Sequence, residues 1–285
     1  MTHGDDAMLS RREFVGGLAA AAAVRRRSPD RAAPPPPNEP NLARILRTKR
    51  LRVAGLVAEE PYSYKDPASG QWGGICVTMA RNLAAELGVE ITVVESNPAD
   101  LLVDVHTGKI DLAYLSPTAP RGMFVDFATP LFYDTYAIVA RKDFVPKGWA
   151  EINVPETLVA VDTGSAREEA ARRLVGNAAI TGFKTRDEAT AAIQSGRADC
   201  FVTTVFFALT ALKKNPQLGD LVMPTPHLRA DVCPGMPYDD DRRFRGVVDA
   251  WLEDNRELGR IREWIVADLV RFGIEPGDLP PEVSF

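Results

Sequence analysis

The sequence has few of the residues that build metal, disulfide and nucleophile sites. Its 285 residues include three cysteines and three histidines, and no CxxC pair occurs. A disulfide framework, a dithiol site and a zinc site are therefore not expected. The patterns GxxxxGK[ST], GxSxG and HExxH are also missing, which leaves nucleotide hydrolysis, serine-hydrolase and zinc-protease chemistry without a motif. We expect no cofactor and no metal.

Basic residues are not in excess either. Lys plus Arg number 34 against 39 Asp plus Glu, a net charge of −5 with His neutral, and residues 1–31 hold six of the basic but four of the acidic ones. The rest of the chain is therefore still more acidic and offers no basic field to nucleic acid or anionic lipid. The apolar content of 45% instead predicts a substantial core in one or two domains.

Apolar runs are short, far below the ~20 residues that span a bilayer. Residues 10–24 begin with Ser10-Arg11-Arg12 and continue as an alanine-rich run that ends in small residues, which is typical of a signal peptide. The arginine pair and Phe14 resemble the twin-arginine export motif. A basic leader without a signal is the alternative. We predict a twin-arginine-type signal peptide over 1–24.

A change of composition follows the leader. Residues 25–40 contain the run Pro34–Pro37 and few core-forming side chains, which predicts an extended, Pro-rich linker. The first cysteine is Cys76, so a lipoprotein anchor is not expected. Together these features predict an exported protein of the periplasm that is soluble and not a lipoprotein.

Strand and helix patterns alternate through the rest of the chain. Ile75–Leu87 places apolar residues at the spacing of one helical face between two β-rich segments, and this order predicts a β-α-β unit. Ser165 with Glu168, and Thr185 with Glu188, have the spacing of capping boxes. We expect strands at 51–57, 91–94, 110–115, 137–140, 158–161, 180–183 and 198–202, and helices at 75–87, 99–106, from 165, 185–194 and as a pair over 244–272 that breaks near Gly259.

Several separated motifs resemble one family. They are Leu51-Arg52-Val53 with Pro61–Tyr64, Gly74–Ala80, Gly108–Leu112 with Ser116–Arg121, Val125–Phe127, Ser195–Asp199 and Leu252–Trp264. In this order they resemble the extracellular solute-binding proteins of family 3, the polar-amino-acid type that serves ABC importers. The resemblance implies an α/β, two-lobe periplasmic-binding-protein-like (type II) fold with a two-strand hinge. It also implies a discontinuous lobe 1 at 42–133 plus 234–275, lobe 2 at 134–233 and a tail at 276–285.

The same resemblance assigns a carboxylate site. It makes Arg121 the group that binds a ligand carboxylate, and a guanidinium suits that role because its planar fork of donors can grip a carboxylate bidentately. A surface pair with Asp126 is the alternative for Arg121. Ser116 would add donors from lobe 1, and Gly164 with Ser165 would add them from lobe 2, although a serine is also a common turn or helix-capping residue.

One departure from the family bears on the ligand. Amino-acid binders of this kind place an aspartate for the ligand's ammonium where this chain has Thr204. Either the ligand lacks an ammonium at that position, or Glu59 or Glu60 supplies the negative charge. In the alternative interpretation, Glu59 and Glu60 are solvated residues of a surface loop. Tyr62 and Tyr114, with Tyr64 and Trp72, are candidates for the walls of the site or for core positions. The cysteines Cys76, Cys200 and Cys233 allow at most one disulfide.

The resemblance implies a substrate-binding protein, not an enzyme. We expect a monomer that captures a small carboxylate-bearing solute, an amino acid or a related organic acid or amine, and delivers it to the membrane subunits of an ABC permease. Two alternatives stay open: a cyclohexadienyl-dehydratase-like enzyme on the same fold, which needs a general acid in the cleft, and a ligand-binding partner of a membrane sensor.

Overall fold

The computed structural model describes residues 39–285. The predicted signal peptide, and the predicted linker as far as residue 38, lie outside the described residues. Within the described part of the chain, helices are too short or too polar to cross a membrane.

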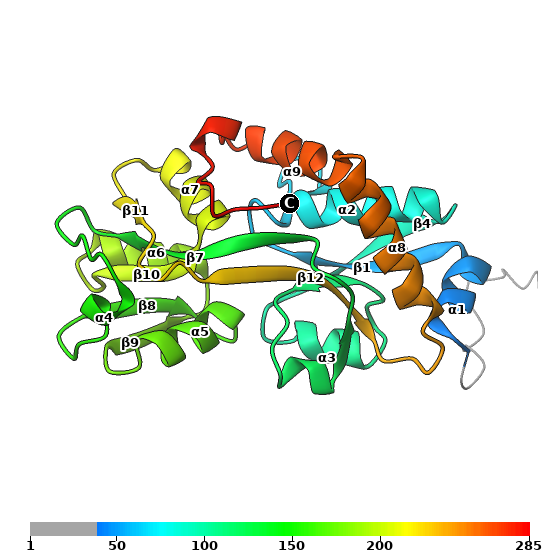
Figure 1. Ribbon diagram of the computed structural model, residues 1–285, viewed down its shortest axis with the longest axis horizontal. Helices are drawn as coiled ribbons and strands as arrows, with labels where there is room; N and C mark the ends of the chain where they lie inside the picture. The colour runs from blue at the N-terminus through cyan, green and yellow to red at the C-terminus, as the bar shows by residue number, and fades with distance from the viewer. Residues whose placement is uncertain (1–38) are drawn as a thin grey trace, which may run out of the picture. The chain divides into compact units, whose positions relative to one another are not determined.

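A first lobe is built around a parallel strand pair and the helices that cover it (Figure 1). Strands β1 and β4 pair in parallel, with Leu51 opposite Ile91, as the expected β-α-β unit requires. The elements of this lobe are α1 (Asn41–Thr48), β1 (Arg50–Leu56), β2 (Tyr64–Lys65), β3 (Trp72–Gly73), α2 (Ile75–Glu86), β4 (Glu90–Ser96), α3 (Leu101–His106), β5 (Ala113–Leu115), the 3-10 turn η1 (Arg121–Met123), β6 (Val125–Phe127), α8 (Arg243–Glu257), α9 (Arg260–Val270) and η2 (Pro276–Asp278).

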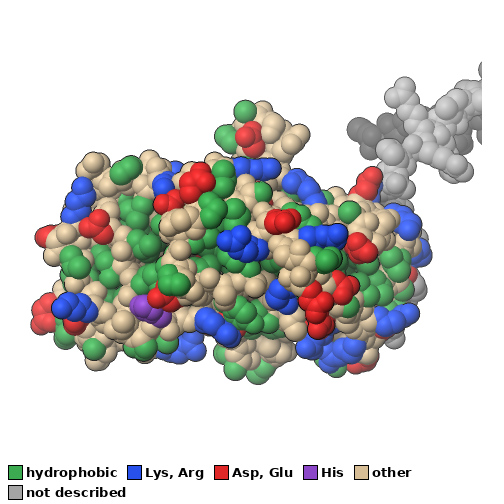
Figure 2. All heavy atoms as spheres, turned by 45° about the horizontal axis from the view of Figure 1, so that its top comes forward, with side chains coloured by type: hydrophobic (Ala, Val, Ile, Leu, Met, Phe, Trp, Pro, Cys, Tyr) green, Lys and Arg blue, Asp and Glu red, His purple; other side chains and the backbone are tan. Residues whose placement is uncertain are grey.

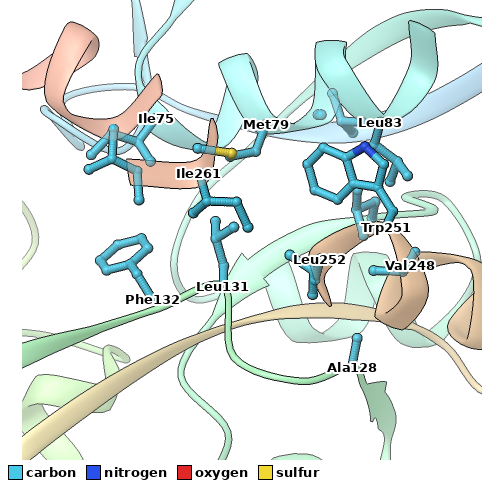
Figure 3. Packing of buried hydrophobic residues seen from close by; sticks show 14 of the residues in the cluster. Ile75, Met79, Leu83, Ala128, Leu131, Phe132, Val248, Trp251, Leu252 and Ile261 are labelled. Atoms are coloured by element: carbon cyan, nitrogen blue, oxygen red, sulfur yellow. The ribbon is translucent and has the colours of Figure 1, made fainter. Parts of the chain in front are cut away.

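The core of this lobe forms between α2 and the C-terminal helix pair (Figure 3). Ile75, Met79 and Leu83 lie on one face of α2 and are fully buried, because their spacing repeats once per helical turn. They pack with Leu252 of α8 and Ile261 of α9. The C-terminal helix pair α8 and α9 therefore completes the core of the first lobe.

Gly74 begins α2 and fixes the direction of the loop before it. Its φ of 99° lies in the region that favours glycine, and a Cβ there would lie 2.7 Å from the carbonyl oxygen of Tyr62. The loop of residues 57–63 can therefore pass close to the start of α2, which brings Tyr62 toward the middle of the molecule.

A second lobe has its own mixed sheet. Strands β9, β8 and β10 are parallel, and β10 then pairs antiparallel with β7. Thr185 and Glu188 form the complete capping box that the sequence predicts at the start of α6. The elements of this lobe are α4 (Trp149–Ile152), β8 (Leu158–Asp162), α5 (Ala166–Leu174), β9 (Ala179–Phe183), α6 (Arg186–Gln194), β10 (Cys200–Thr204), α7 (Val205–Lys214) and β11 (Asp220–Val222).

Two long strands, β7 (Phe132–Ala140) and β12 (Arg229–Pro237), run through both lobes (Figure 1). They pair with each other over 132–135 and 229–232. Beyond that segment β7 pairs with β10 in the second lobe, and β12 pairs with β5 and β6 in the first. This change of partners gives the two-strand connection expected of the fold. The exact lobe boundaries predicted from the sequence stay predictions.

Two strands differ in extent from the sequence prediction. β5 starts at Ala113 rather than at residue 110; before it, the Asp111 carboxylate accepts hydrogen bonds from the backbone and side chain of Arg52, and Leu112 forms an isolated parallel bridge with Val53. β10 spans Cys200–Thr204 rather than 198–202, and Asp199 just before it uses its side chain to accept the N–H of Leu158.

The segment expected as a tail, 276–285, packs against the strand connection. Ser284 exchanges two backbone hydrogen bonds with Tyr133 of β7, and the ring of Phe285 stacks on Phe206 at 6.4 Å. Glu282 also contacts His227, with 2.9 Å between the carboxylate oxygen and Nδ1. This segment is therefore part of the packed structure.

Candidate functional site

A pocket lies where the two lobes meet, the kind of junction at which small-molecule sites are often found. The first lobe contributes the loop after β1 and the turn after β5, and the second lobe contributes the start of α5 and the end of β10. The eight site residues predicted from the sequence all line this pocket: Glu59, Tyr62, Tyr114, Ser116, Arg121, Gly164, Ser165 and Thr204. Their roles in binding stay predictions.

Arg121 reaches across the pocket to the second lobe. Its guanidinium Nη2 lies 3.2 Å from Oε1 of Glu169 on α5, and Nη1 lies 3.5 Å from the carbonyl oxygen of Ser116. The alternative pairing with Asp126 is wrong, because Asp126 binds Arg242 and Arg245 instead. The Arg121 side chain is 14% exposed, so its guanidinium is available to a carboxylate within the pocket.

The turn Gly164-Ser165 is held by its own helix. Gly164, at a φ of 78°, donates its N–H to Glu168 at 2.8 Å. The Ser165 hydroxyl accepts from the N–H of Glu168 at 3.1 Å and donates to Asp162 at 2.8 Å. The N-cap alternative for Ser165 is therefore correct, and the donors predicted for a ligand are engaged within the chain. The next residues of the helix, Ala166 and Arg167, also line the pocket, at a helix start where N–H groups lack partners within the helix.

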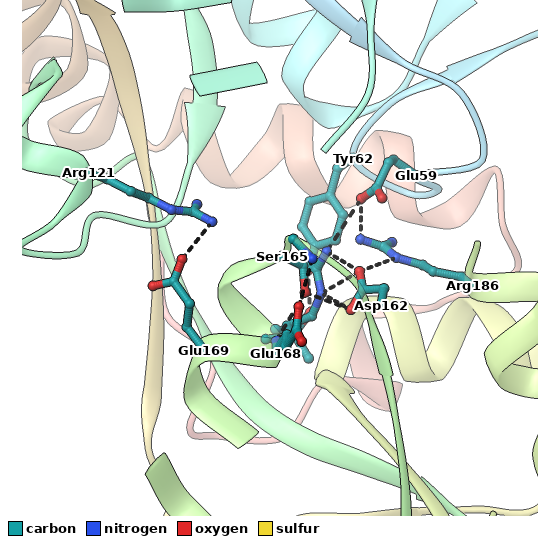
Figure 4. A network of polar contacts seen from close by, with 11 residues as sticks. Glu59, Tyr62, Arg121, Asp162, Ser165, Glu168, Glu169 and Arg186 are labelled. Carbon is teal, nitrogen blue, oxygen red and sulfur yellow. Dashed lines mark hydrogen bonds and ion pairs between the residues drawn. The ribbon is translucent and has the colours of Figure 1, made fainter. Parts of the chain in front are cut away.

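A buried cluster of ion pairs joins the lobes beside this turn (Figure 4). Glu59 of the first lobe pairs with Arg186 of α6, whose side chain is 3% exposed. Arg167 lies 2.6 Å from Asp162 and 3.8 Å from Glu59, and Arg186 Nε lies 3.4 Å from Asp162. Although burial opposes ionisation, the two guanidinium groups hold the pKa of Asp162 below its ordinary range. Burial raises the pKa of Glu59, while Arg186 and Arg167 act to lower it.

The sequence reasoning did not single out Asp162, Arg167 and Arg186. One signal was available for two of them: Asp162 ends a strand and Arg167 is the second residue of the helix after the turn, and such positions meet at the edge of an α/β sheet. For Arg186, 127 residues from its partner Glu59, no local pattern pointed to the pairing.

A second buried group lies behind Thr204. The Tyr62 hydroxyl donates to Asp134 of β7 at 2.5 Å and lies 2.6 Å from the Thr204 hydroxyl. Burial raises the pKa of Asp134 and also raises that of Tyr62, which Asp134 raises further. The Tyr62 phenol therefore stays protonated and donates a hydrogen bond to the carboxyl group of Asp134. Asp134 was not expected from the sequence, because its partner Tyr62 lies 72 residues earlier in the chain and no local pattern links the two.

The remaining candidates divide between the pocket and other places. Tyr114 lines the pocket, and its buried hydroxyl has no hydrogen-bond partner among the described residues. The alternative in which Glu60 supplies a negative charge to the ligand is wrong. Its carboxylate lies 3.5 Å from Lys214 and lines a second pocket instead. Tyr64 packs edge-on against Phe272, and Trp72 lies under Lys65, so neither is a wall of the site.

The three cysteines are buried free thiols. Cys76 lines the pocket and is 9% exposed, and burial raises the pKa of its thiol far above the ordinary range. A protonated, buried thiol acts as a small apolar side chain. Cys76 therefore contributes to the pocket wall as a small apolar side chain.

Comparison with known proteins gives a family and a fold. Residues 51–263 match the bacterial extracellular solute-binding proteins, family 3. A cyclohexadienyl dehydratase from Pseudomonas aeruginosa is 27% identical over 229 residues, which are 79% of this chain and 84% of that protein. Among solved structures, an ancestral amino acid-binding protein, described as a precursor of cyclohexadienyl dehydratase, is 28% identical with a TM-score of 0.71, over 79% of this chain and 97% of the other.

A further solved structure supports the fold. It is a substrate-binding protein of an amino acid ABC transporter from Streptococcus pneumoniae, bound to L-arginine, with a TM-score of 0.73 at 22% identity over 80% of this chain and 98% of that one. These matches confirm the type II fold and the family expected from the sequence motifs. The chain belongs to the bacterial extracellular solute-binding proteins, family 3.

Proposed function

We propose that this protein is a periplasmic receptor that captures a small carboxylate-bearing solute between its lobes and delivers it to an ABC permease. One observation carries the proposal: Arg121 of the first lobe and the start of α5 in the second line the same pocket. A solute held by both lobes favours the closed arrangement, which is how hinge-closure proteins couple binding to a change of shape. The permease would then recognise that closed form.

Electrostatics support a carboxylate as the group that is bound. The Arg121 guanidinium already binds one carboxylate, that of Glu169 on the opposite lobe. A guanidinium with two donors in one plane holds a carboxylate by charge-assisted hydrogen bonds. On the face drawn in Figure 2, acidic and basic side chains are interspersed, so this face has no continuous basic field.

The test is a binding screen on protein that has been unfolded and refolded to remove any carried-over ligand. Amino acids, amines, dicarboxylates and aromatic carboxylates are added to wild type, to Arg121→Ala and to the control Arg245→Ala. Arg245 pairs with Asp126 and Asp249, outside the pocket. A ligand at 100 times its Kd stabilises the wild type by about 2.7 kcal/mol.

We expect this shift in wild type and in Arg245→Ala, and its loss in Arg121→Ala, where about 1.5–3 kcal/mol of charge-assisted bonding is removed. An equal shift in Arg121→Ala and wild type, or no shift with any carboxylate, would overturn the proposal.

The similarity to a dehydratase favours one second candidate, an enzyme that removes the hydroxyl of prephenate as water and its ring carboxylate as carbon dioxide, which leaves an aromatic acid. Such a step needs a proton donor beside the departing hydroxyl. Glu59 is the carboxyl group among the described residues that line the pocket, and burial raises its pKa, which suits a proton donor. Its carboxylate is, however, engaged by Arg186 and lies 3.8 Å from Arg167. This engagement argues for binding over catalysis. Incubation with prephenate, followed by measurement of the aromatic product, tests the enzyme: turnover that Glu59→Gln abolishes would establish it.

A further inference from the structure

We infer that the carboxylate taken by this pocket carries no ammonium group and has an apolar body, as in a 2-hydroxy, 2-oxo or aromatic acid. This inference rests on the proposed function, because it specifies the ligand of the same pocket. It follows from three features of the site: the lining has no free acid for an ammonium, the inner charges balance one another, and much of the wall is apolar.

The first feature is the lack of a carboxylate for an ammonium. Among the described lining residues Glu59 is the acid, and its carboxylate faces the guanidinium groups of Arg186 and Arg167. Thr204 offers a neutral hydroxyl that is already 2.6 Å from Tyr62. An ammonium buried against neutral or positive groups loses its hydration without gaining a partner.

The second feature is the balance of charge. Arg167 and Arg186 face the carboxylates of Glu59 and Asp162, so two guanidinium groups meet two buried acids and neither acid is left for a ligand. Nη1 of Arg186 has no hydrogen-bond partner in the described part of the chain. Figure 4 shows Arg121 apart from this cluster, paired with Glu169.

Glu169 is 41% exposed, and a ligand carboxylate can take its place on Arg121 at little cost, because exposed ion pairs are weak. A monoanion then takes over the charge that Glu169 supplies to Arg121. The ammonium of a zwitterion would meet no free carboxylate among the described lining residues and would add a cation to a pocket that Arg167 also lines. The carboxyl group of Asp134 does not serve as a partner for a ligand ammonium, because it already accepts a hydrogen bond from the Tyr62 hydroxyl.

The third feature is the lining. Leu56, Leu101, Leu115 and Val232 face the pocket and suit an apolar ligand body. The buried Tyr114 hydroxyl, with no partner among the described residues, can donate to an oxygen of the ligand. A 2-hydroxy or 2-oxo acid with an apolar body fits both the apolar lining and the Tyr114 hydroxyl, because its hydroxyl or oxo oxygen can accept the hydrogen bond that Tyr114 donates.

Matched acids with one carbon skeleton give the test, with calorimetric titration of the refolded full chain. L-phenylalanine is compared with L-phenyllactate and phenylpyruvate, L-leucine with its 2-hydroxy and 2-oxo acids, and L-aspartate with L-malate, which has a polar body. We expect the hydroxy or oxo acid to bind about tenfold or more tightly than the amino acid of its skeleton, and phenyllactate or the leucine analogue to bind more tightly than malate.

Thr204→Asp, with Thr204→Asn as a control of the same size, adds a second readout. The aspartate variant should shift the preference toward the amino acid by about tenfold, and the asparagine variant should not. If Thr204→Asp does not fold, the wild-type ratios still decide the matter.

The possible failures are distinct. An amino acid that binds wild type as tightly as its hydroxy or oxo analogue, with loss of binding in Arg121→Ala, refutes this inference and leaves the receptor standing. Tighter binding of malate refutes the apolar body. Failure of every carboxylate to bind refutes the proposed function, and this inference with it.

Discussion

Replacing Glu59 with glutamine removes the negative charge that joins the loop after β1 to the second lobe. Breaking one partner of a buried pair costs about 3–5 kcal/mol, because the other charge stays buried. Asp162 still lies 3.4 Å from Arg186 and compensates part of its charge, so we expect a smaller cost than this, about 2–3 kcal/mol of unfolding free energy. For a domain of this size, that is a fall in Tm of about 5–10 °C.

The neighbouring residue is a matched control. Glu60 pairs with Lys214 at 3.5 Å, and the lysine side chain is 56% exposed. Exposed pairs contribute about 0–1 kcal/mol, so Glu60→Gln should lower the Tm by no more than about 3 °C. Urea unfolding of both variants measures the difference at a common pH and salt concentration.

A double-mutant cycle isolates the interaction from other effects of the substitution. Glu59→Gln and Arg186→Met together should be less destabilising than the sum of the two single changes, with a coupling energy of about 1 kcal/mol or more. If Glu59→Gln is no more destabilising than Glu60→Gln, or if the cycle shows no coupling, the pair does not hold the lobes together and the reasoning is refuted.

Three further outcomes are expected. Glu169→Gln removes the carboxylate that competes for Arg121 and should tighten ligand binding by about two- to fivefold; weaker binding in titrations would show that Glu169 supports the site instead. The lowered pKa of Asp162 adds stability that is present above about pH 4 and lost as the pH falls below it, so urea unfolding of Asp162→Asn should depend less on pH between about 5 and 2; an unchanged slope would contradict this. Burial raises the pKa of all three thiols, so a thiol reagent should label them only in denaturant, and labelling of the folded protein would contradict their burial.

Local patterns in the sequence were sufficient for most secondary structure. The apolar spacing of Ile75, Met79 and Leu83 predicts α2 and the face it buries, since both depend on one helical period. The capping box at Thr185 likewise predicts where α6 begins, because its bonds join residues three apart. The family motifs, spread over the chain, added the two-lobe fold and eight residues that the structure places around one pocket.

Other features of the site depend on contacts between distant segments. Neighbours in one loop, Glu59 and Glu60, have different environments: one pairs with buried Arg186, the other with exposed Lys214. No helical or strand period applies to a loop, so the sequence could not tell which acid faces inward.

The sequence by itself determined the elements, the family and the set of residues around the pocket, because these depend on local periodicity and on motif order. Only the tertiary structure decided which of those residues have groups left for a ligand. Asp134 and Arg186 engage Tyr62 and Glu59, which lie 72 and 127 residues away in the chain, and these partners are set by the approach of β7 and α6 to the loop after β1. Charge pairing depends on distance and burial in space, and residues far apart in the chain carry no local record of it.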